Sequence, residues 1–401
     1  MAVNRLIYGI LLVLSVLFAN FYGGKIPYTL LFITLLLPLF SFLYTLVLFA
    51  GFKYIQSVDG KYVLKGDKLK YRLNINNEGP LYYPYVKINF HISSTFLAGQ
   101  LQEESFSLLP GEKTSFSYEL ECKYRGVFAI GLSSVEFEDL LGMFRLRFNI
   151  KETKEIIIYP KIVYLDLFHL RTSFLSDTHT LINSLYEDFT TISDIRRYSY
   201  GDTMKRIHWK LSAKMDELYV KTFQGTSRTV ATIFLDLKRI EGPMENQVIV
   251  EDKLIEAAVA VIRYCLYNWI PVDLVYCTKD IVNLEAKAPS DFERIYKELA
   301  QIRFDQSVAI TDVMELFWAG SIKKTDVFIF TADLNYDLYN QIYKIRHNGY
   351  DVNIIYISSD TLKSGINPDI ASITEFLTDI GVSVYRLEVN DDIKLALESK
   401  L

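Results

Sequence analysis

The stretch IPYTLLFITLLLPLFSFLYTLVLFAGF, residues 26–52, carries no charged side chain. The hydrocarbon core of a bilayer is crossed by about 20 apolar helical residues, so this run is long enough to span one. Pro38 lies inside the run and predicts a kink, which membrane helices tolerate when neighbouring groups satisfy the freed carbonyl. The stretch therefore predicts a transmembrane helix.

A second apolar run, residues 6–22, precedes this helix and is interrupted only by the polar Ser15 and Asn20. Its length is close to the lower limit for a span, and a cleaved signal peptide is the competing interpretation. No small-residue cleavage pattern precedes residue 26, which favours a helix that is retained. We expect residues 1–53 to hold two transmembrane helices, at about 6–22 and 26–52.

The basic residues predict how this pair of helices is oriented. Arg5 precedes the first run, and the short connection between the runs holds only Lys25. Six basic residues follow the second run within about 20 positions: Lys53, Lys61, Lys65, Lys68, Lys70 and Arg72. Under the positive-inside rule both ends of the hairpin lie in the cytoplasm. The sequence predicts a multi-pass protein of the cell membrane, with the lipid bilayer as one partner and its soluble domains in the cytoplasm.

Composition sets limits on the rest of the chain. It has 401 residues, of which 50% are hydrophobic, and a net charge of −5. That is enough apolar material for two or three cores, and it excludes a mainly disordered chain. There is no overall basic excess, so we expect no nucleic-acid partner. The cysteines, Cys122, Cys265 and Cys277, are too few and too widely spaced for a disulfide framework, which fits a reducing compartment.

The segment 54–163 alternates between apolar and polar residues. Residues 70–76, 86–92 and 116–122 show this period of two most clearly, and Gly- or Pro-containing turn sequences separate them. Such alternation is typical of strands with one buried and one solvated face. Several short strands at this spacing predict a small antiparallel β-sandwich.

Residues 229–401 alternate between strand-like and helical patterns. The strands are expected at 229–237, 272–277, 326–331, 352–358 and 382–389, and the clearest helices at 251–269, 291–302 and 336–347. Continuous apolar strands separated by helices predict an α/β domain with a mainly parallel sheet covered on both faces.

A segment linking these domains, residues 164–228, contains the most distinctive sequence of the chain, RYSYGDTMKRIHWKLSAK at 197–214. Gly201 and Asp202 predict a turn followed by an N-cap, since an Asp carboxylate accepts hydrogen bonds from the first amides of a helix. A helix from about Thr203 to Met215 is expected. Its apolar stripe would consist of Met204, Ile207, Leu211 and Met215.

Two interpretations of this motif are open. In the structural one, Asp202 caps the helix, Trp209 packs between the domains, and the basic residues are solvated or paired with nearby carboxylates. In the functional one, the motif is a basic patch edged by an aromatic ring that binds an acidic protein surface or a phosphate. The candidate binding residues are Arg197, Gly201, Asp202, Arg206, His208, Trp209, Lys210, Lys214 and Lys221.

The phrases RRYSYGDTMKRIHWKLSAKMDELYVK (196–221) and YRGVFAIGLSSVEFEDLLGMFRLRFNIKETKEIIIYPKIV (124–163) resemble the bacterial family called domain of unknown function 58. The order of two membrane helices, a β-domain and an α/β domain is similar to that family's layout. The resemblance implies that the α/β domain is similar to a von Willebrand factor A domain. It also implies a protein partner of the MoxR-type AAA+ ATPase class.

The implied fold often holds a divalent metal through an Asp-x-Ser-x-Ser sequence after its first strand. Here the corresponding residues are Asp236, Lys238 and Ile240, so both hydroxyl ligands are replaced and a cation is added. Asp333 stands where a second acidic ligand is expected. We expect a degenerate site without metal or other cofactor, in which Asp236 pairs with Lys238.

No phosphate-binding glycine loop, zinc-protease motif or nucleophile elbow occurs in the sequence. The first hypothesis is therefore a scaffold or interaction protein without enzymatic activity. The alternative is a phosphate- or nucleotide-handling enzyme or sensor built on Arg197, Asp202, Arg206, His208 and Lys210.

Overall fold

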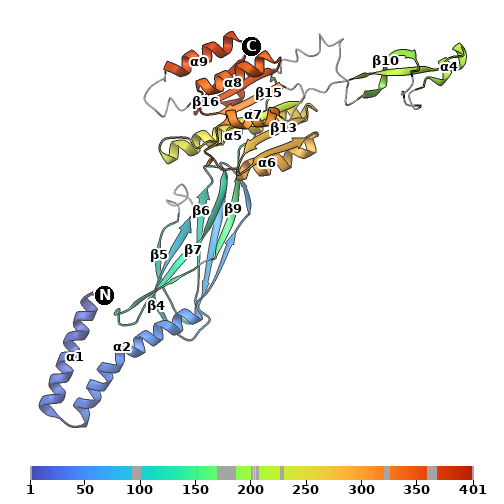
Figure 1. The fold of residues 1–401 in the computed structure, drawn as a ribbon. Coiled ribbons are helices and arrows are strands. Elements are labelled where there is room, and N and C mark those ends of the chain that lie inside the picture. The colour runs from blue at the N-terminus through green and yellow to red at the C-terminus, as the bar shows by residue number, and fades with distance from the viewer. Residues whose placement is uncertain are drawn as a thin grey trace. The chain divides into compact units, whose positions relative to one another are not determined.

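The computed structural model describes residues 2–92, 101–150, 152–168, 187–199, 202, 204, 207–225, 230–319, 326–358 and 368–399. The chain divides into two compact units (Figure 1). The first unit is Met1–Lys161 together with Tyr296–Arg303, and the second unit is Ile162–Ile295 together with Phe304–Leu401.

The first unit opens with two long apolar helices, α1 (Ala2–Tyr22) and α2 (Lys25–Gly51), as the sequence predicts. Gly23 and Gly24 both have positive φ values, 59° and 84°, and this left-handed backbone reverses the chain at little steric cost. The helices pack on each other, and the Tyr8 hydroxyl donates to the Thr34 carbonyl oxygen at 3.0 Å. Both helices are long and apolar enough to cross a membrane.

The strands of the first unit form two sheets. One has the antiparallel order β1-β3-β6, with β1 at Lys53–Val58, β3 at Lys68–Asn76 and β6 at Lys113–Glu121. The other has the order β2-β9-β7-β4-β5, and β8 pairs with β7. Its strands are β2 (Tyr62–Leu64), β9 (Thr153–Tyr159), β7 (Gly126–Glu138), β4 (Tyr83–Ile92), β5 (Glu104–Leu108) and β8 (Arg145–Asn149).

One hydrophobic core lies between these two sheets. On β3 the apolar residues Leu69, Tyr71, Leu73 and Ile75 are buried and the polar residues between them are exposed or half-buried. They cluster with residues of β4 and β7 such as Ile88, so the sheets pack face to face as a sandwich. Among the strands that the structure describes in this unit, only the short pair β2–β9 is parallel.

The residues Tyr296–Arg303 belong to this first unit although they lie far along the chain. The buried Arg125, which precedes β7, donates from Nη1 to the carbonyl oxygens of Leu299 and Ile302 at 3.0 and 2.9 Å. The Tyr296 hydroxyl donates to the Pro160 carbonyl oxygen at 2.6 Å. The two Arg125 contacts satisfy carbonyl groups at the end of a helix, where carbonyls lack partners inside the helix.

The second unit contains a six-stranded sheet of order β14-β13-β12-β15-β16-β17. All pairs are parallel except β13–β14, so the sheet is mixed and mostly parallel, as predicted. The strands are β12 (Ala231–Leu235), β13 (Val272–Cys277), β14 (Ile281–Ala286), β15 (Asp326–Thr331), β16 (Asp351–Ser358) and β17 (Ser383–Glu388). Numbered along the chain, the parallel strands have the order 2-1-3-4-5, an arrangement of doubly wound α/β folds.

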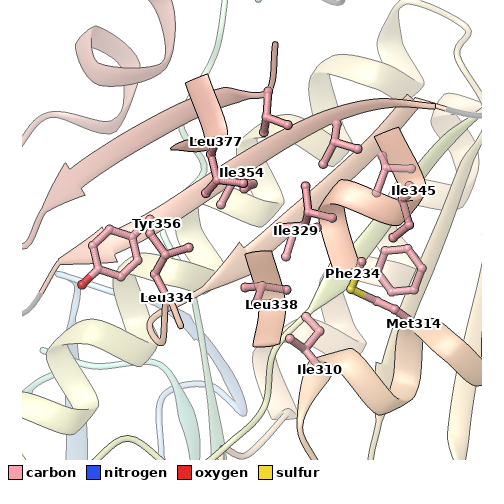
Figure 2. Close-up of a cluster of buried hydrophobic side chains, with 14 of the residues drawn as sticks. Phe234, Ile310, Met314, Ile329, Leu334, Leu338, Ile345, Ile354, Tyr356 and Leu377 are labelled. Carbon is pink, nitrogen blue, oxygen red and sulfur yellow. The ribbon is translucent and has the colours of Figure 1, made fainter. Parts of the chain in front are cut away.

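Helices cover both faces of this sheet. Figure 2 shows one face, where Phe234 and Ile329 of the strands meet Met314 and Leu338 of the helices. The helix α5 contacts β13, β15 and β16 but contributes nothing to that cluster, so it covers the opposite face. The helices are α5 (Met244–Tyr267), α6 (Phe292–Gln301), α7 (Ile310–Ala319), α8 (Tyr336–His347), α9 (Pro368–Asp379) and α10 (Ile393–Glu398).

Earlier in the sequence of the second unit, before β12, a two-stranded antiparallel sheet is formed by β10 (Glu187–Arg197) and β11 (Tyr219–Gly225). The short helix α4 (Trp209–Met215) lies in the connection between the two strands. We call β10, β11 and this connection the central hairpin.

Candidate functional site

The sheet of the second unit has its topological switch point between β12 and β15. The chain leaves these adjacent strands toward opposite sides, since β13 flanks β12 and β16 flanks β15. In open α/β sheets the crevice at the carboxyl ends of such strands is the usual place for a ligand. Asp236 directly follows β12, and Asp333 lies two residues after the end of β15.

The carboxylate of Asp236 is buried and satisfied by neighbours within this unit. The Thr331 hydroxyl donates to its Oδ2 at 2.7 Å, and the Lys238 amide donates to its Oδ1 at 3.1 Å. Burial raises the pKa of Asp236, and the two hydrogen bonds oppose that shift. Thr331 was not predicted as a residue of this site, because the sequence marks it only as the last residue of an apolar strand.

The side chain of Lys238 pairs with Asp333 rather than with Asp236. Its Nζ lies 2.9 Å from Asp333 Oδ2, whereas the sequence predicted a pair with Asp236. The reason is that Lys238 bonds to the Asp236 carboxylate through its backbone amide and not through its ammonium group. The ammonium group is then free to pair with Asp333, which follows the adjacent strand. The two aspartates and Lys238 border a cavity of about 220 Å³ whose other lining residues are Arg239, Ile240, Glu241, Phe304 and Ala332.

The residues of this crevice do not fit a divalent metal. Both oxygens of Asp236 already accept hydrogen bonds, and Asp333 holds an ammonium group in the position that a cation would need. A hard cation prefers several oxygen ligands, and Lys238 and Ile240 stand where the metal-binding sequence has hydroxyls. Among the residues that the structure describes, no three His, Cys, Asp or Glu side chains form a metal-binding group.

The central hairpin differs from its prediction at Asp202. The carboxylate of Asp202 forms a two-pronged ion pair with Arg196, with Nη1 at 2.9 Å and Nη2 at 2.7 Å, and it accepts the Ser199 amide at 2.9 Å. It therefore closes a turn after β10, and the N-cap of α4 is a different residue, His208. The ion pair also raises the pKa of the exposed Arg196.

Within the range 203–215 predicted to be one helix, the α-helix α4 begins at Trp209, and Met204 lies in a 3-10 turn. Ile207 forms a β-bridge with Val220, and the His208 amide donates to the Tyr219 carbonyl oxygen at 2.8 Å, so the chain stays paired with β11 up to this point. His208 is the N-cap, and its Nδ1 accepts the Leu211 amide at 3.2 Å. At Ile207 and His208, pairing with β11 has therefore taken the place of the expected helix.

The predicted apolar stripe of this helix is mostly uncovered. Ile207 is buried, but Met204 and Met215 are exposed, and Leu211 is only half-buried. Trp209 keeps 63% of its surface exposed, beside the exposed Lys210 and Lys214.

The remaining candidate residues of the motif have mixed surroundings. Arg197 pairs with Glu217 at 3.0 Å, and Lys221 is half-buried. Gly201 and Arg206 lie outside the described residues. The hairpin therefore gathers Arg197, His208, Trp209, Lys210 and Lys214 on one short connection, with two of its arginines already paired with carboxylates.

The fold thus defines the second unit as a doubly wound α/β unit preceded by the central hairpin. Residues 194–357 match the model of the family described as "Protein of unknown function DUF58". This match begins in β10 and ends in β16, and it confirms the resemblance seen in the sequence. A comparison with curated proteins found no match.

Solved structures show weaker similarity. An aerotolerance-related membrane protein from Bacteroides fragilis is 11% identical, with a TM-score of 0.29, and the match covers 43% of this chain and 96% of that one. The hypothetical protein BatB from Bacteroides thetaiotaomicron is 12% identical, with a TM-score of 0.30 and coverages of 42% and 93%. A CARDB domain from Pyrococcus furiosus is 15% identical, with a TM-score of 0.19 and coverages of 27% and 88%. TM-scores this low do not define a common overall fold.

Proposed function

We propose that this chain is a membrane-anchored scaffold without enzymatic activity, which binds a protein partner through the central hairpin. The observation that carries the proposal is the exposure of Trp209 on that hairpin, in the same short helix as the exposed Lys210 and Lys214. The coarser statement, that this is a membrane-associated protein of the DUF58 type, rests on its two apolar helices and on the family match.

The exposed residues of the hairpin have the composition of a binding surface. Trp is among the residues most enriched in binding hot spots, and Met adapts to partners of different shape. Met204, Met215 and Leu218 are exposed within a few residues of Trp209. The surface fits a partner with an apolar pocket for the indole and acidic residues around its rim. A MoxR-type AAA+ ATPase is the partner that the family resemblance favours.

The topology of the anchor is part of the proposal. Arg5, at the start of α1, donates from Nε to the Met143 carbonyl oxygen at 2.8 Å, so the amino-terminal end of α1 lies beside the sandwich that follows α2. This contact supports a membrane-spanning hairpin with both ends on one side. The basic residues from Lys53 to Arg72 favour the cytoplasm for that side.

The α/β unit is proposed to be similar to a von Willebrand factor A domain in which an ammonium group takes the place of the metal. The strand order and the position of Asp236 after β12 support this interpretation. Because Lys238 neutralises Asp333 within the unit, partner binding there would not need a shared divalent cation. The exposed tryptophan then becomes the main candidate for recognition.

A phosphate- or nucleotide-handling role is the second candidate, and the basic composition of the hairpin favours it. Three contacts weaken it: Arg196 pairs with Asp202, Arg197 pairs with Glu217, and His208 accepts a helix amide through Nδ1. A phosphate ligand that binds the folded state would raise the melting temperature of the purified chain, and the rise would continue with ligand concentration because the stabilisation follows the logarithm of 1 + [L]/Kd.

The test is quantitative mass spectrometry of the proteins that copurify with the tagged full-length chain from the membranes of its own host. Trp209→Ala is compared with Trp269→Ala, because Trp269 is equally exposed, at 65%, and lies outside the hairpin. We expect Trp209→Ala alone to lose a specific partner, with an AAA+ ATPase among the proteins lost. Equal recovery of every protein by both variants would contradict the proposed function.

A further inference from the structure

The turn between β7 and β8, residues Asp139–Phe144, is tied to both apolar helices of the first unit. Asn4 of α1 donates from Nδ2 to the Leu141 carbonyl oxygen at 2.9 Å, and Arg5 donates from Nε to the Met143 carbonyl oxygen. On the other side the Ser41 hydroxyl of α2 donates to the Asp139 carboxylate. The turn therefore lies between the first turn of α1 and the middle of α2 and is hydrogen-bonded to both.

The shape of this turn is fixed by its own hydrogen bonds. Asp139 is buried, and its Oδ1 accepts the Phe144 amide at 2.8 Å, while the Gly142 amide donates to the Asp139 carbonyl oxygen at 3.0 Å. Gly142 has a φ of 64°, and a Cβ at this position would collide with the Asn4 amide group. The turn thus presents Leu140 and Leu141 in a defined position.

The contacts of α2 show where it begins to pack on the sandwich. From Ser41 onward the helix packs on the sandwich: Thr45 and Leu48 are buried, and the Phe49 ring stacks on Phe148 with centroids 3.5 Å apart. The Tyr83 hydroxyl donates to the Leu48 carbonyl oxygen at 3.0 Å. One face of the last three turns of α2 therefore packs on the sandwich, while Phe42, Leu43, Leu46 and Val47 on its other faces stay exposed.

The apolar lengths of the two helices outside these contacts are short. The apolar part of α2 before Ser41 measures about 22 Å, and the run 6–22 of α1 measures about 25 Å, at about 1.5 Å per residue. The hydrocarbon core of a bilayer is about 30 Å thick. Such a hairpin is shorter than the hydrocarbon core. Apolar side chains of the sandwich can fill the remaining thickness if they enter the membrane next to the ends of the two helices.

We propose that the turn Asp139–Phe144 is a third membrane-contacting element, whose Leu140 and Leu141 insert at the boundary between lipid headgroups and acyl chains. Leu140 is 57% exposed and Leu141 is 37% exposed, and both lie at the level of Arg5 and Ser41. The exposed Arg147 follows on β8 and pairs with Glu136 at 3.8 Å, and its outer side would meet anionic headgroups if the turn inserts. The proposal rests on the membrane-spanning hairpin proposed above.

The occupant of this surface is a bilayer because the apolar tip is continuous with two helices that themselves face lipid. Most large apolar residues of α1 and α2 before Ser41 are exposed, as lipid-facing side chains are when no membrane surrounds them. Insertion would hold the first unit against the membrane at a fixed height through the contacts of Asp139, Asn4 and Arg5, rather than leaving it free on a linker.

The experiment is electron paramagnetic resonance of the full-length chain, spin-labelled at single introduced cysteines, in vesicles of phosphatidylcholine and phosphatidylglycerol. Leu140→Cys is the test site, and Leu11→Cys on α1 is the membrane reference. Leu64→Cys is the matched control, since this exposed leucine lies near the opposite end of β7, about 40 Å along the strand. The native cysteines are buried, so the unmodified chain serves as the labelling blank.

We expect the labels at 140 and 11 to be relaxed more strongly by oxygen than by a water-soluble nickel complex, and the label at 64 to show the reverse. If the label at 140 is exposed to water and the label at 11 is exposed to lipid, the inserted turn is overturned and the spanning hairpin stands. Aqueous labels at both sites would overturn the hairpin and the turn together. Spin–spin broadening at 140 that persists on dilution with lipid would show a second copy on the surface, and would also overturn the proposal.

Discussion

The Nζ atom of Lys238 lies 2.9 Å from Oδ2 of Asp333, at the point where the adjacent parallel strands β12 and β15 end. The two residues are 95 positions apart in the sequence, and the sheet brings them together. Asp333 raises the pKa of Lys238, so the ammonium form is favoured. A protein cation thus occupies the part of the crevice in which an α/β unit of this kind can hold a metal or a substrate.

This arrangement predicts how the crevice responds to divalent cations. The wild-type chain should give no binding heat with Mg²⁺, Mn²⁺ or Ca²⁺ at millimolar concentration in titration calorimetry. Replacing Lys238→Ser and Ile240→Ser together frees Asp333 and supplies two hydroxyl ligands, so this variant should bind Mn²⁺. Lys238→Met with Ile240 retained is the control, because it removes the charge without adding a ligand. A micromolar site in the wild type that Asp236→Ala abolishes would contradict the account.

Asp326 predicts a pH-dependent stability. It is buried at the start of β15, next to Asp351 of β16, and within the described part of the chain neither carboxylate oxygen has a hydrogen-bond partner. Burial, and secondarily the charge of Asp351, raise the pKa of Asp326 to about 7. Between about pH 4 and pH 7 the folded chain therefore keeps a proton on Asp326 that the unfolded chain has released. The free energy of unfolding falls as pH rises through this range, and the stability that depends on this proton is lost by about pH 7.

The variant Asp326→Asn keeps the shape but removes the titration. Its free energy of unfolding should change less than that of the wild type between pH 4 and 7, and it should exceed the wild-type value above pH 7. Each pKa unit corresponds to about 1.4 kcal/mol. Urea unfolding of the detergent-solubilised chain, followed at several pH values, measures both quantities. Parallel pH profiles for the two proteins would show that Asp326 is ionised in the fold.

The start of α4 can be tested at single amides by hydrogen exchange with mass spectrometry or NMR. His208→Ala removes the acceptor of the Leu211 amide, so that amide should exchange faster. As for other lost N-caps, the free energy of unfolding should fall by about 1 kcal/mol. Asp202→Ala should leave the Leu211 amide unchanged and expose the Ser199 amide instead. If Asp202→Ala accelerated exchange throughout residues 204–211, the longer helix with Asp202 as its cap would be correct.

Charge reversal on α4 separates binding from folding. Lys210 and Lys214 are exposed, so changing both to Glu should alter the free energy of unfolding by no more than about 0.5 kcal/mol per site. It should nevertheless abolish partner capture, since like charges across an interface are strongly unfavourable. Melting curves and pull-downs on the same preparations give both readouts. Loss of the fold would assign the lysines a structural role, and retention of fold and partner would make them a solvated face.

Much of the fold could be predicted from local patterns. The expected strand 272–277 and the helix 336–347 have the bounds seen in the structure, because continuous apolar runs and a well-formed helix end decide them locally. The alternation in 70–76 likewise matches β3, whose apolar side chains are buried. The antiparallel edge strand β14 was not predicted, because a short alternating segment after a turn differs little from a loop.

The candidate site was less predictable, because its contacts join distant segments. The composition of the central motif favours a helix, yet Ile207 pairs with Val220, and tertiary pairing prevails over local propensity. The partner of Lys238 could not be chosen from the sequence either. Two aspartates were within reach, and which one met the ammonium depended on the backbone hydrogen bond between Lys238 and Asp236.

The most direct test of the central claim is photocrosslinking in living cells, with a benzophenone amino acid placed at position 209 or at the matched exposed position 269. The account predicts a specific crosslinked band to one protein at 209, absent at 269, and lost when Lys210 and Lys214 are changed to Glu. No crosslink at 209, or an identical set of crosslinks at 209 and 269, would contradict the claim that the central hairpin captures a protein partner.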